Sequence, residues 1–233
     1  MSLLKIFPRP KSIKIGLRCQ ICGKTFTQRA ECLILDMGTV ERKRAGEQLP
    51  FNDFFVPARV ICPHCQAEDQ YALSSWQSFR VALALLWTQW IFPGSESWLQ
   101  VVTLGTQDGR IMHPFELRAW YAERVLHNPQ KVEWRVLYAN TLRFHGRAAE
   151  AEYQYRAALE LAPHQTEALI NLAALLAQRG EQNEALNHLS VLANIRPRNE
   201  KQRQRVDIAR DVLVDKLPLD ELKVGNPWVP RRQ

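Results

Sequence analysis

Residues 132–163 read VEWRVLYANTLRFHGRAAEAEYQYRAALELAP, and residues 166–197, offset by 34 positions, read TEALINLAALLAQRGEQNEALNHLSVLANIRP. The two stretches share small, turn-forming and helix-ending residues at matched positions. The matched pairs are Ala139 and Ala173, Gly146 and Gly180, Ala151 and Ala185, Leu161 and Ile195, and Pro163 and Pro197. Alanine lets two helices approach closely, glycine suits the turn between them, and proline cannot continue a helix. The spacing therefore predicts a helical unit that repeats along the chain.

The period and the matched residues resemble the tetratricopeptide repeat, a pair of antiparallel helices, over residues 132–199. Two positions depart from the pattern, since Leu192 replaces the small residue seen at Ala158, and Tyr138 replaces the leucine seen at Leu172. The resemblance implies an all-α helical solenoid that binds a peptide or a helix in its concave face, which the first helix of each pair lines. The residues expected on that face are Val136, Asn140, Phe144, Ile170, Asn171 and Ala174, beside Glu133.

Capping helices are expected on both sides of the repeats, because two repeats alone bury little apolar surface. Residues 114–127 predict a preceding helix, with proline in its first turn and an Asn-Pro pair as its stop. In the resemblance, this helix takes the place of the second helix of a degenerate repeat. Residues 200–216 predict a polar closing helix. The helical array is thus expected over residues 114–216, followed by an extended tail at residues 217–233.

A carboxylate-binding site is a further implication of the resemblance. Some tetratricopeptide domains hold the C-terminal carboxylate of a peptide with lysine, arginine and asparagine side chains from successive first helices. Asn140 and Asn171 match those asparagines, and Lys201 and Arg205 match the cations if the period continues past residue 197. Val136 stands where a further lysine would be, so this clamp is incomplete. In the alternative, the asparagines bond the backbone and the cations form a solvated cap. Convergence of the four side chains would separate the two interpretations.

Two pairs of cysteines mark the N-terminal part of the chain. Cys19 and Cys22 lie in the sequence CQICGK, and Cys62 and Cys65 enclose the sequence CPHC. Two residues separate the sulfurs of each pair, so a tight turn can aim both thiolates at one ion, and two such turns complete a tetrahedral sulfur shell. A closed shell is typical of structural sites, since no position is open for water or substrate. The fifth cysteine, Cys32, lies among apolar residues and is expected to be a buried, inert thiol.

The two knuckles resemble a zinc ribbon, and the second also resembles the bacterial domains named for paired C-P-x-C motifs. They are similar to rubredoxin, an iron protein, as well, although Gln66 replaces the second glycine of the rubredoxin pattern. Four thiolates bind either metal, so the resemblance leaves iron open, and zinc is the expected ion.

The ribbon is expected over residues 1–73 and a connector over residues 74–113. In the connector, Ser74 and Ser75 predict the start of a helix that includes residues 79–91, and a β-hairpin is expected with its turn at residues 107–109. Four tryptophans make the connector aromatic. A buried core between ribbon and helices is the expected interpretation, with an exposed partner surface or a membrane-surface helix as alternatives. The strands predicted in the ribbon are residues 13–18, 26–35, 54–61 and 71–73, with an exposed charged excursion at residues 41–52.

Composition and charge restrict the function. The chain has 233 residues and a formal net charge of +7, with the excess near its two ends. The start of the chain lacks the features of a signal peptide, and residues 79–92, the most apolar stretch, are too short to span a bilayer. A cytoplasmic protein is therefore expected, whose reduced thiols favour a metal over disulfides. The sequence has no phosphate-binding glycine loop, nucleophile elbow or paired-histidine metal motif, and His145 and His164 are expected in exposed turns, so no enzyme activity is expected.

The expected fold class is α+β, a small β-rich metal ribbon followed by the all-α helical array. The expected function is a non-catalytic scaffold or assembly factor that binds a protein or peptide. As an alternative, the basic ribbon, with the Arg42-Lys43-Arg44 cluster, would bind nucleic acid or a ribosome, although a solvated charged loop explains this cluster equally well. In a further alternative, an iron site would make the protein an electron carrier.

Overall fold

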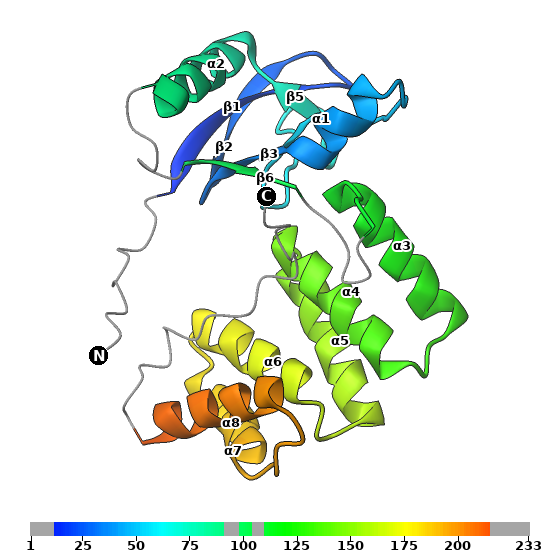
Figure 1. Cartoon of the computed structure of the whole chain (residues 1–233), viewed down its shortest axis with the longest axis vertical. Coiled ribbons are helices and arrows are strands. Elements are labelled where there is room, and N and C mark those ends of the chain that lie inside the picture. Colours follow the sequence, from blue (N-terminus) through cyan, green and yellow to red (C-terminus); the bar gives the residue numbers. More distant parts are fainter. Residues whose placement is uncertain (1–11, 91–97, 104–109, 215–233) are drawn as a thin grey trace. The chain divides into compact units, whose positions relative to one another are not determined.

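The computed structural model describes residues 12–90, 98–103 and 110–214, without the side chains of residues 86–90. The chain divides into two compact units, the first ending at His113 and the second beginning at Pro114 (Figure 1). The described elements of the first unit are β1 (Ile13–Cys19), β2 (Thr25–Ala30), β3 (Leu33–Asp36), α1 (Met37–Arg44), β4 (Phe54–Phe55), β5 (Tyr71–Leu73), α2 (Ser75–Trp90) and β6 (Leu99–Val102). Those of the second unit are α3 (Pro114–His127), α4 (Val132–Phe144), α5 (Ala148–Leu161), α6 (Thr166–Gln178), α7 (Gln182–Ala193) and α8 (Glu200–Leu213). The predicted layout, a small β-containing region followed by helices, is confirmed.

The first sheet of the N-terminal unit has the strand order β2-β1-β5, and both neighbours run antiparallel to β1. Ile15, Leu17 and Cys19 are buried along β1, whereas Lys14, just before Ile15, and Arg18, between Leu17 and Cys19, are exposed. This alternation is that of a half-buried strand, because successive side chains point to opposite faces. The strands predicted at residues 13–18 and 71–73 are thus confirmed.

The second sheet has the order β4-β3-β6, with β3 antiparallel to β4 and parallel to β6. All four residues of β3 are buried. The prediction of one returning strand through residues 26–35 is wrong, because the chain leaves the first sheet after Ala30 and enters the second at Leu33. A strand that is buried on both faces lies in the middle of a sheet, with a neighbouring strand on each side, as β3 does. Strand β2 lies at the edge of its own sheet, so the two segments cannot form one continuous strand.

Helix α1 replaces the first part of the predicted charged excursion at residues 41–52. Its N-terminus is fixed by Asp36, whose buried carboxylate accepts hydrogen bonds from the amide of Gly38 at 3.1 Å and the hydroxyl of Thr39 at 2.6 Å. Aspartate is a preferred N-cap residue because its oxygens satisfy amides that have no partner within the helix. Residues 41–44 of the predicted excursion are therefore helical, and Glu41 and Arg44 among them are exposed as predicted.

Helix α2 begins as predicted, with the hydroxyl of Ser74 accepting a hydrogen bond from the amide of Gln77 at 3.3 Å. The expectation that the tryptophans form a buried core is wrong for Trp76, whose exposed fraction is 68%. Trp98 is half-buried and lies 5.5 Å from the guanidinium carbon of Arg80. The turn of the predicted hairpin lies outside the described residues, and the described strand β6 pairs with β3 instead.

The second unit repeats its helices at a constant interval. Helices α4, α6 and α8 begin at residues 132, 166 and 200, and helices α3, α5 and α7 begin at residues 114, 148 and 182, so equivalent helices start 34 residues apart. Gly146 and Gly180 have φ angles of +69° and +85° in the turns inside each pair, a conformation that glycine adopts without strain. Each expected helix is present. Within the described ranges, none of the helices has both the length and the apolar character needed to cross a bilayer.

The core of this unit consists of the small and apolar residues that the period singled out. Four alanines of the core are fully buried, namely Ala139, Ala151, Ala173 and Ala185. Tyr155 is the largest fully buried side chain of the same core. Val206 and Ala209 of α8 belong to the same core, so the closing helix is packed against the pairs before it. Alanine at the crossing points brings the helix axes close together, and the larger side chains fill the space beside them.

Candidate metal centre

The four predicted ligands come from two turns of the first unit. Cys19 ends β1 and Cys22 follows in the next turn, while Cys62 and Cys65 lie in the turn between β4 and β5. All four Sγ atoms lie within 4.8 Å of one another. The Cys19 and Cys65 sulfurs are 3.6 Å apart, and the Cys22 and Cys62 sulfurs are 3.7 Å apart. A tetrahedral site with Zn–S bonds of about 2.3 Å has sulfurs about 3.8 Å apart, so the cluster has the size of one such site.

The two knuckles have the same backbone hydrogen bonds. In each, the amide of the first cysteine donates to the carbonyl five residues later at 2.9 Å, and the amide four residues later donates back to the carbonyl of that cysteine at 3.0 Å. Gly23 and Gln66 occupy the same position of this turn, with φ angles of +72° and +60°. Equal turns present equal pairs of sulfurs, so two of them facing each other make a four-sulfur cluster.

Backbone amides also point at the sulfurs. The amide of Ile21 donates to Sγ of Cys19 and the amide of His64 donates to Sγ of Cys62, each at 3.4 Å. The amides of Cys22 and Ile21 lower the pKa of Cys19 to about 7 against the opposing effect of desolvation. Four thiols this close cannot all ionise unless a cation compensates their charge, and a bound metal ion supplies that charge. The donor set therefore fits a divalent metal.

Exposure differs among the four ligands. Cys19 and Cys62 are buried, Cys22 is half-buried and Cys65 is exposed. The cluster thus lies near the surface, where an ion can enter, while all four ligand positions are sulfur and the shell is closed. Among the described residues, no other group of three or more histidine, cysteine or acidic side chains is placed to hold a metal. These four cysteines can bind a metal ion.

Two nearby residues take no part in the cluster. Cys32 is buried just before β3, and burial raises the pKa of its thiol to about 11, so it is a protonated core residue as predicted. His64 is exposed inside the second knuckle, where its amide rather than its ring faces a sulfur.

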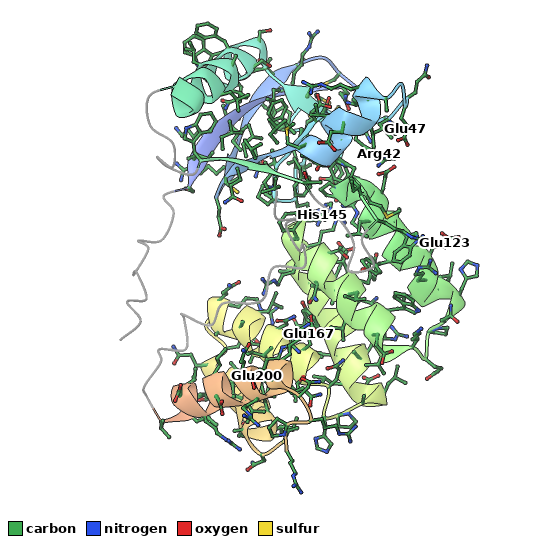
Figure 2. All side chains as sticks on the ribbon, viewed as in Figure 1. Arg42, Glu47, Glu123, His145, Glu167 and Glu200 are labelled. Atoms are coloured by element: carbon green, nitrogen blue, oxygen red, sulfur yellow. The ribbon has the colours of Figure 1, made fainter. Side chains whose placement is uncertain are left out.

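Three of the four residues of the predicted carboxylate clamp contact a carboxylate of the chain itself, and the fourth contacts one of those three. Nδ2 of Asn140 donates to Oε1 of Glu167 at 3.0 Å, Nη2 of Arg205 lies 3.0 Å from Oε2, and Nζ of Lys201 lies 3.9 Å from the same oxygen. Asn171 joins the group by donating to Oδ1 of Asn140 at 2.8 Å. Glu167 lies near the start of α6 (Figure 2), so a carboxylate of the chain itself already contacts the predicted cations.

Two members of this group, Glu167 and Tyr155, were not predicted from the sequence, and the hydroxyl of Tyr155 donates to Oδ1 of Asn140 at 2.6 Å. Glu167 precedes Asn171 by four residues, and residues at this spacing share one face of a helix, so the spacing was a usable signal. Both asparagines therefore bond side chains rather than the backbone.

The other residues expected to line the concave face have little exposed surface. Val136, Ile170 and Ala174 are buried and belong to the apolar core of the unit, and Phe144 is half-buried. Asn140 and Asn171 are buried as well, whereas Lys201 is exposed. Binding of a peptide by these residues stays a prediction.

The expectation that His145 is exposed in a turn is wrong. His145 follows α4 directly and is buried, with Nε2 3.2 Å from the carbonyl oxygen of Pro114 and its ring 5.2 Å from the ring of Phe115. The histidine thus joins α3 to the end of α4 (labelled in Figure 2). His164, by contrast, is exposed in the turn between α5 and α6.

The basic cluster of the first unit is largely paired within the chain. Arg42 forms an ion pair with Glu47 at 2.6 Å (Figure 2), and Lys43 forms one with Asp53 at 2.8 Å. Arg44 is exposed. A cation whose charge is neutralised by a neighbouring carboxylate attracts a phosphate backbone less strongly, so these pairs weaken the argument for a nucleic-acid surface.

Comparison of the chain with family models and with curated proteins finds no match. Two features of the molecule are left from which a function can be inferred. One is the closed cluster of four cysteines, and the other is the helical unit whose elements recur every 34 residues.

Proposed function

We propose that the protein is a non-catalytic scaffold or assembly factor, in which a tetratricopeptide-type helical unit binds a protein partner and a zinc-bound ribbon provides a second, rigid contact surface. The observation that carries the proposal is the recurrence of equivalent helix starts at 34-residue intervals in α3 to α8. Stacked equivalent helices repeat the same surface positions at regular distances, and such surfaces suit extended protein partners.

The metal in this proposal is zinc with a structural role. Four sulfur ligands leave no position for a substrate, and zinc is the usual ion of closed four-cysteine sites. Because small sites of this kind fold as they bind the metal, the zinc would hold the two knuckles, and with them β1 and β5, in place. Free thiols persist in a reducing compartment, so we place the protein in the cytoplasm.

The experiment that tests the function is affinity capture of the tagged full-length chain from crosslinked source cells, with and without nuclease, followed by mass spectrometry. A protein that co-purifies in fixed stoichiometry after nuclease treatment is the expected result. Recovery that disappears with nuclease would replace the scaffold with a nucleic-acid-binding function, and failure to recover any protein would remove the scaffold function.

The metal is tested on the same preparation by elemental analysis and absorbance. One zinc per chain and a colourless protein are expected. A red protein with one iron per chain would support the electron carrier instead, because ferric thiolate centres absorb visible light and zinc does not.

A further inference from the structure

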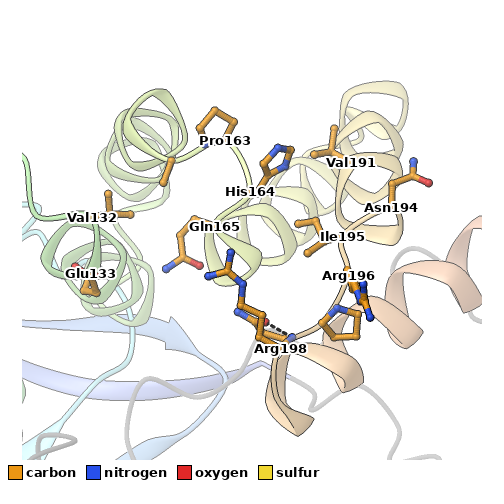
Figure 3. A pocket seen from close by; sticks show the side chains of 13 residues that line it. Val132, Glu133, Pro163, His164, Gln165, Val191, Asn194, Ile195, Arg196 and Arg198 are labelled. Atoms are coloured by element: carbon orange, nitrogen blue, oxygen red, sulfur yellow. Dashed lines mark hydrogen bonds between the residues drawn. The ribbon is translucent and has the colours of Figure 1, made fainter.

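A pocket of about 840 Å³ lies where the turns between successive helix pairs meet (Figure 3). Two equivalent turns form most of it, namely residues 162–165 between α5 and α6 and residues 194–198 between α7 and α8. The first two residues of α4, Val191 of α7 and Gln202 of α8 complete the lining. This pocket belongs to the second unit alone, and it shares no lining residue with the Glu167 cluster or with the predicted concave face other than Glu133.

The pocket combines aliphatic walls with cations. Val191 is 40% exposed, and Ile195 and Val132, which also line the pocket, are half-buried. Arg196 and Arg198 are exposed on the rim, and Figure 3 shows the Arg198 side chain extending toward Gln165 across the pocket. An apolar floor below a charged rim is a common design of peptide-binding pockets.

Neither rim arginine forms an ion pair with any residue that the structure describes, although arginines elsewhere in the unit do. Arg179 pairs with Glu152 at 2.5 Å, and Arg205 pairs with Glu167 at 3.0 Å. The backbone of Arg198 is held in place, since its amide donates to Oε1 of Gln202 at 2.8 Å. The two guanidinium groups are therefore positioned beside an apolar surface with their charge available to an anion.

We propose that this pocket binds an acidic segment of a protein partner, with one aliphatic or aromatic side chain of that segment on Val191 and Ile195 and flanking carboxylates on Arg196 and Arg198. The proposal rests on the scaffold function above and adds the chemistry of the partner. Guanidinium groups bind carboxylates with paired, charge-assisted hydrogen bonds. The volume suits one or two side chains rather than a whole helix.

The lining favours a peptide over a nucleic acid. Proteins that bind single strands stack successive bases on several aromatic rings, and the lining has one aromatic ring, that of His164, and no phenylalanine, tyrosine or tryptophan. Glu133 also lies in the lining and would repel a phosphate chain that runs along it. A short peptide whose carboxylates lie beside Arg196 and Arg198, and not beside Glu133, avoids this repulsion.

The test is selection of a displayed peptide library on the full-length protein at low ionic strength. Each peptide carries one Leu, Ile, Val or Phe flanked by Asp or Glu, and its C-terminus is amidated so that no terminal carboxylate can bind elsewhere. Selected peptides are then measured by fluorescence anisotropy. The Arg196→Glu, Arg198→Glu double variant should bind about tenfold more weakly or worse, because two charge-assisted contacts become repulsive. Val191→Ser should also weaken binding, since it removes apolar contact.

The matched control is the Arg203→Glu, Arg210→Glu double variant, which makes the same change of net charge on exposed positions of α8 outside the pocket. It should bind like the wild type. Absence of enriched acidic peptides, equal binding by the rim variant, equal losses in both double variants, or displacement of the peptides by single-stranded RNA would each overturn the proposal. A captured partner that binds the rim variant as tightly as wild type would remove the pocket site and leave the scaffold function standing, whereas a cell extract without any partner removes the scaffold itself.

Discussion

Gln66 stands, in the second knuckle, at the backbone position that Gly23 holds in the first. Both have positive φ, and the turns around them share their hydrogen bonds. For a residue with a Cβ atom, this left-handed conformation costs about 1–2 kcal/mol. The glutamine in the second knuckle therefore adds a small, local backbone strain to the metal site and does not change the type of turn.

Gln66→Gly should stabilise the first unit. The relief of strain exceeds the extra flexibility of glycine in the unfolded chain, which costs about 0.4–1 kcal/mol, so a net gain of about 0.5–1 kcal/mol is expected. Urea denaturation of the metal-loaded protein, followed by release of the metal, measures it. The reverse change, Gly23→Gln, should lose a similar amount, and a loss in both variants would mean that the two turns are not equivalent.

At the scale of elements, the Glu167 carboxylate joins three helices. It accepts a hydrogen bond from Asn140 of α4, belongs to α6 and pairs with Arg205 of α8. The side chains of Glu167 and Arg205 are about one-fifth exposed, so the pair is only partly screened by water. Helix α8 is thus held to the preceding helices by charge as well as by its apolar residues.

Glu167→Ala should destabilise the helical unit by about 1.5–3 kcal/mol, the usual effect of losing a hydrogen bond to a charged group. Thermal unfolding followed by far-ultraviolet circular dichroism measures the change. Glu160→Ala is the control, because Glu160 is exposed on α5 and surface changes of this kind stay within about 0.5 kcal/mol. Equal effects of the two variants would show that the Glu167 cluster contributes nothing to stability.

A second carboxylate connects neighbouring pairs through arginines. Glu152 of α5 lies 2.8 Å from Arg156 and 2.5 Å from Arg179, and Arg156 also contacts Glu184 of α7 at 2.7 Å. Burial raises the pKa of Glu152, but the hydrogen bonds from the two arginines outweigh it and lower the pKa below the ordinary carboxyl value of 4.5. The folded chain therefore takes up this proton at lower pH than the unfolded chain.

The sign of the pH effect follows from that difference. The stabilisation from Glu152 is present above the ordinary carboxyl pKa and is lost as the pH falls through the lower pKa of the folded state. Glu152→Gln should be less stable than wild type at neutral pH, and the difference should shrink in acid. Urea denaturation at several pH values tests this, with Glu160→Gln as control. A difference that stays constant with pH would contradict the ion-pair explanation.

At the scale of the whole molecule, the chain consists of two compact units, and all four metal ligands lie in the first. Cys22→Ser should therefore abolish metal binding and unfold the first unit while the helical unit stays folded, because the free energy of metal binding in such sites is free energy of folding. Elemental analysis and far-ultraviolet circular dichroism should show a chain without metal that keeps most of its helical signal.

Cys32→Ser is the control, since Cys32 lies outside the cluster and should leave the metal content unchanged. Removal of the metal from wild type with a chelator should reproduce the Cys22→Ser spectrum. Retention of the full metal content by the Cys22→Ser variant would contradict the four-cysteine site.

The sequence by itself determined the features that depend on local spacing. Two residues between cysteines make a knuckle whatever surrounds it, and glycine, proline and alanine at fixed intervals define where helices begin, turn and cross. The helices of the second unit, the cap of α2 at Ser74 and the four cysteines of the cluster were all predictable for this reason.

Tertiary structure decided the contacts between residues far apart in the chain. Leu33 pairs with Leu99 in a parallel ladder, Glu167 meets Arg205, and His145 is buried against Pro114. No local pattern specifies these pairs, because each depends on which of several chemically suitable partners the completed packing brings within about 3 Å. Tertiary packing also decided the charge on the rim of the pocket. Among the described residues, no carboxylate pairs with Arg196 or Arg198, whereas Arg179 and Arg205 of the same unit are paired.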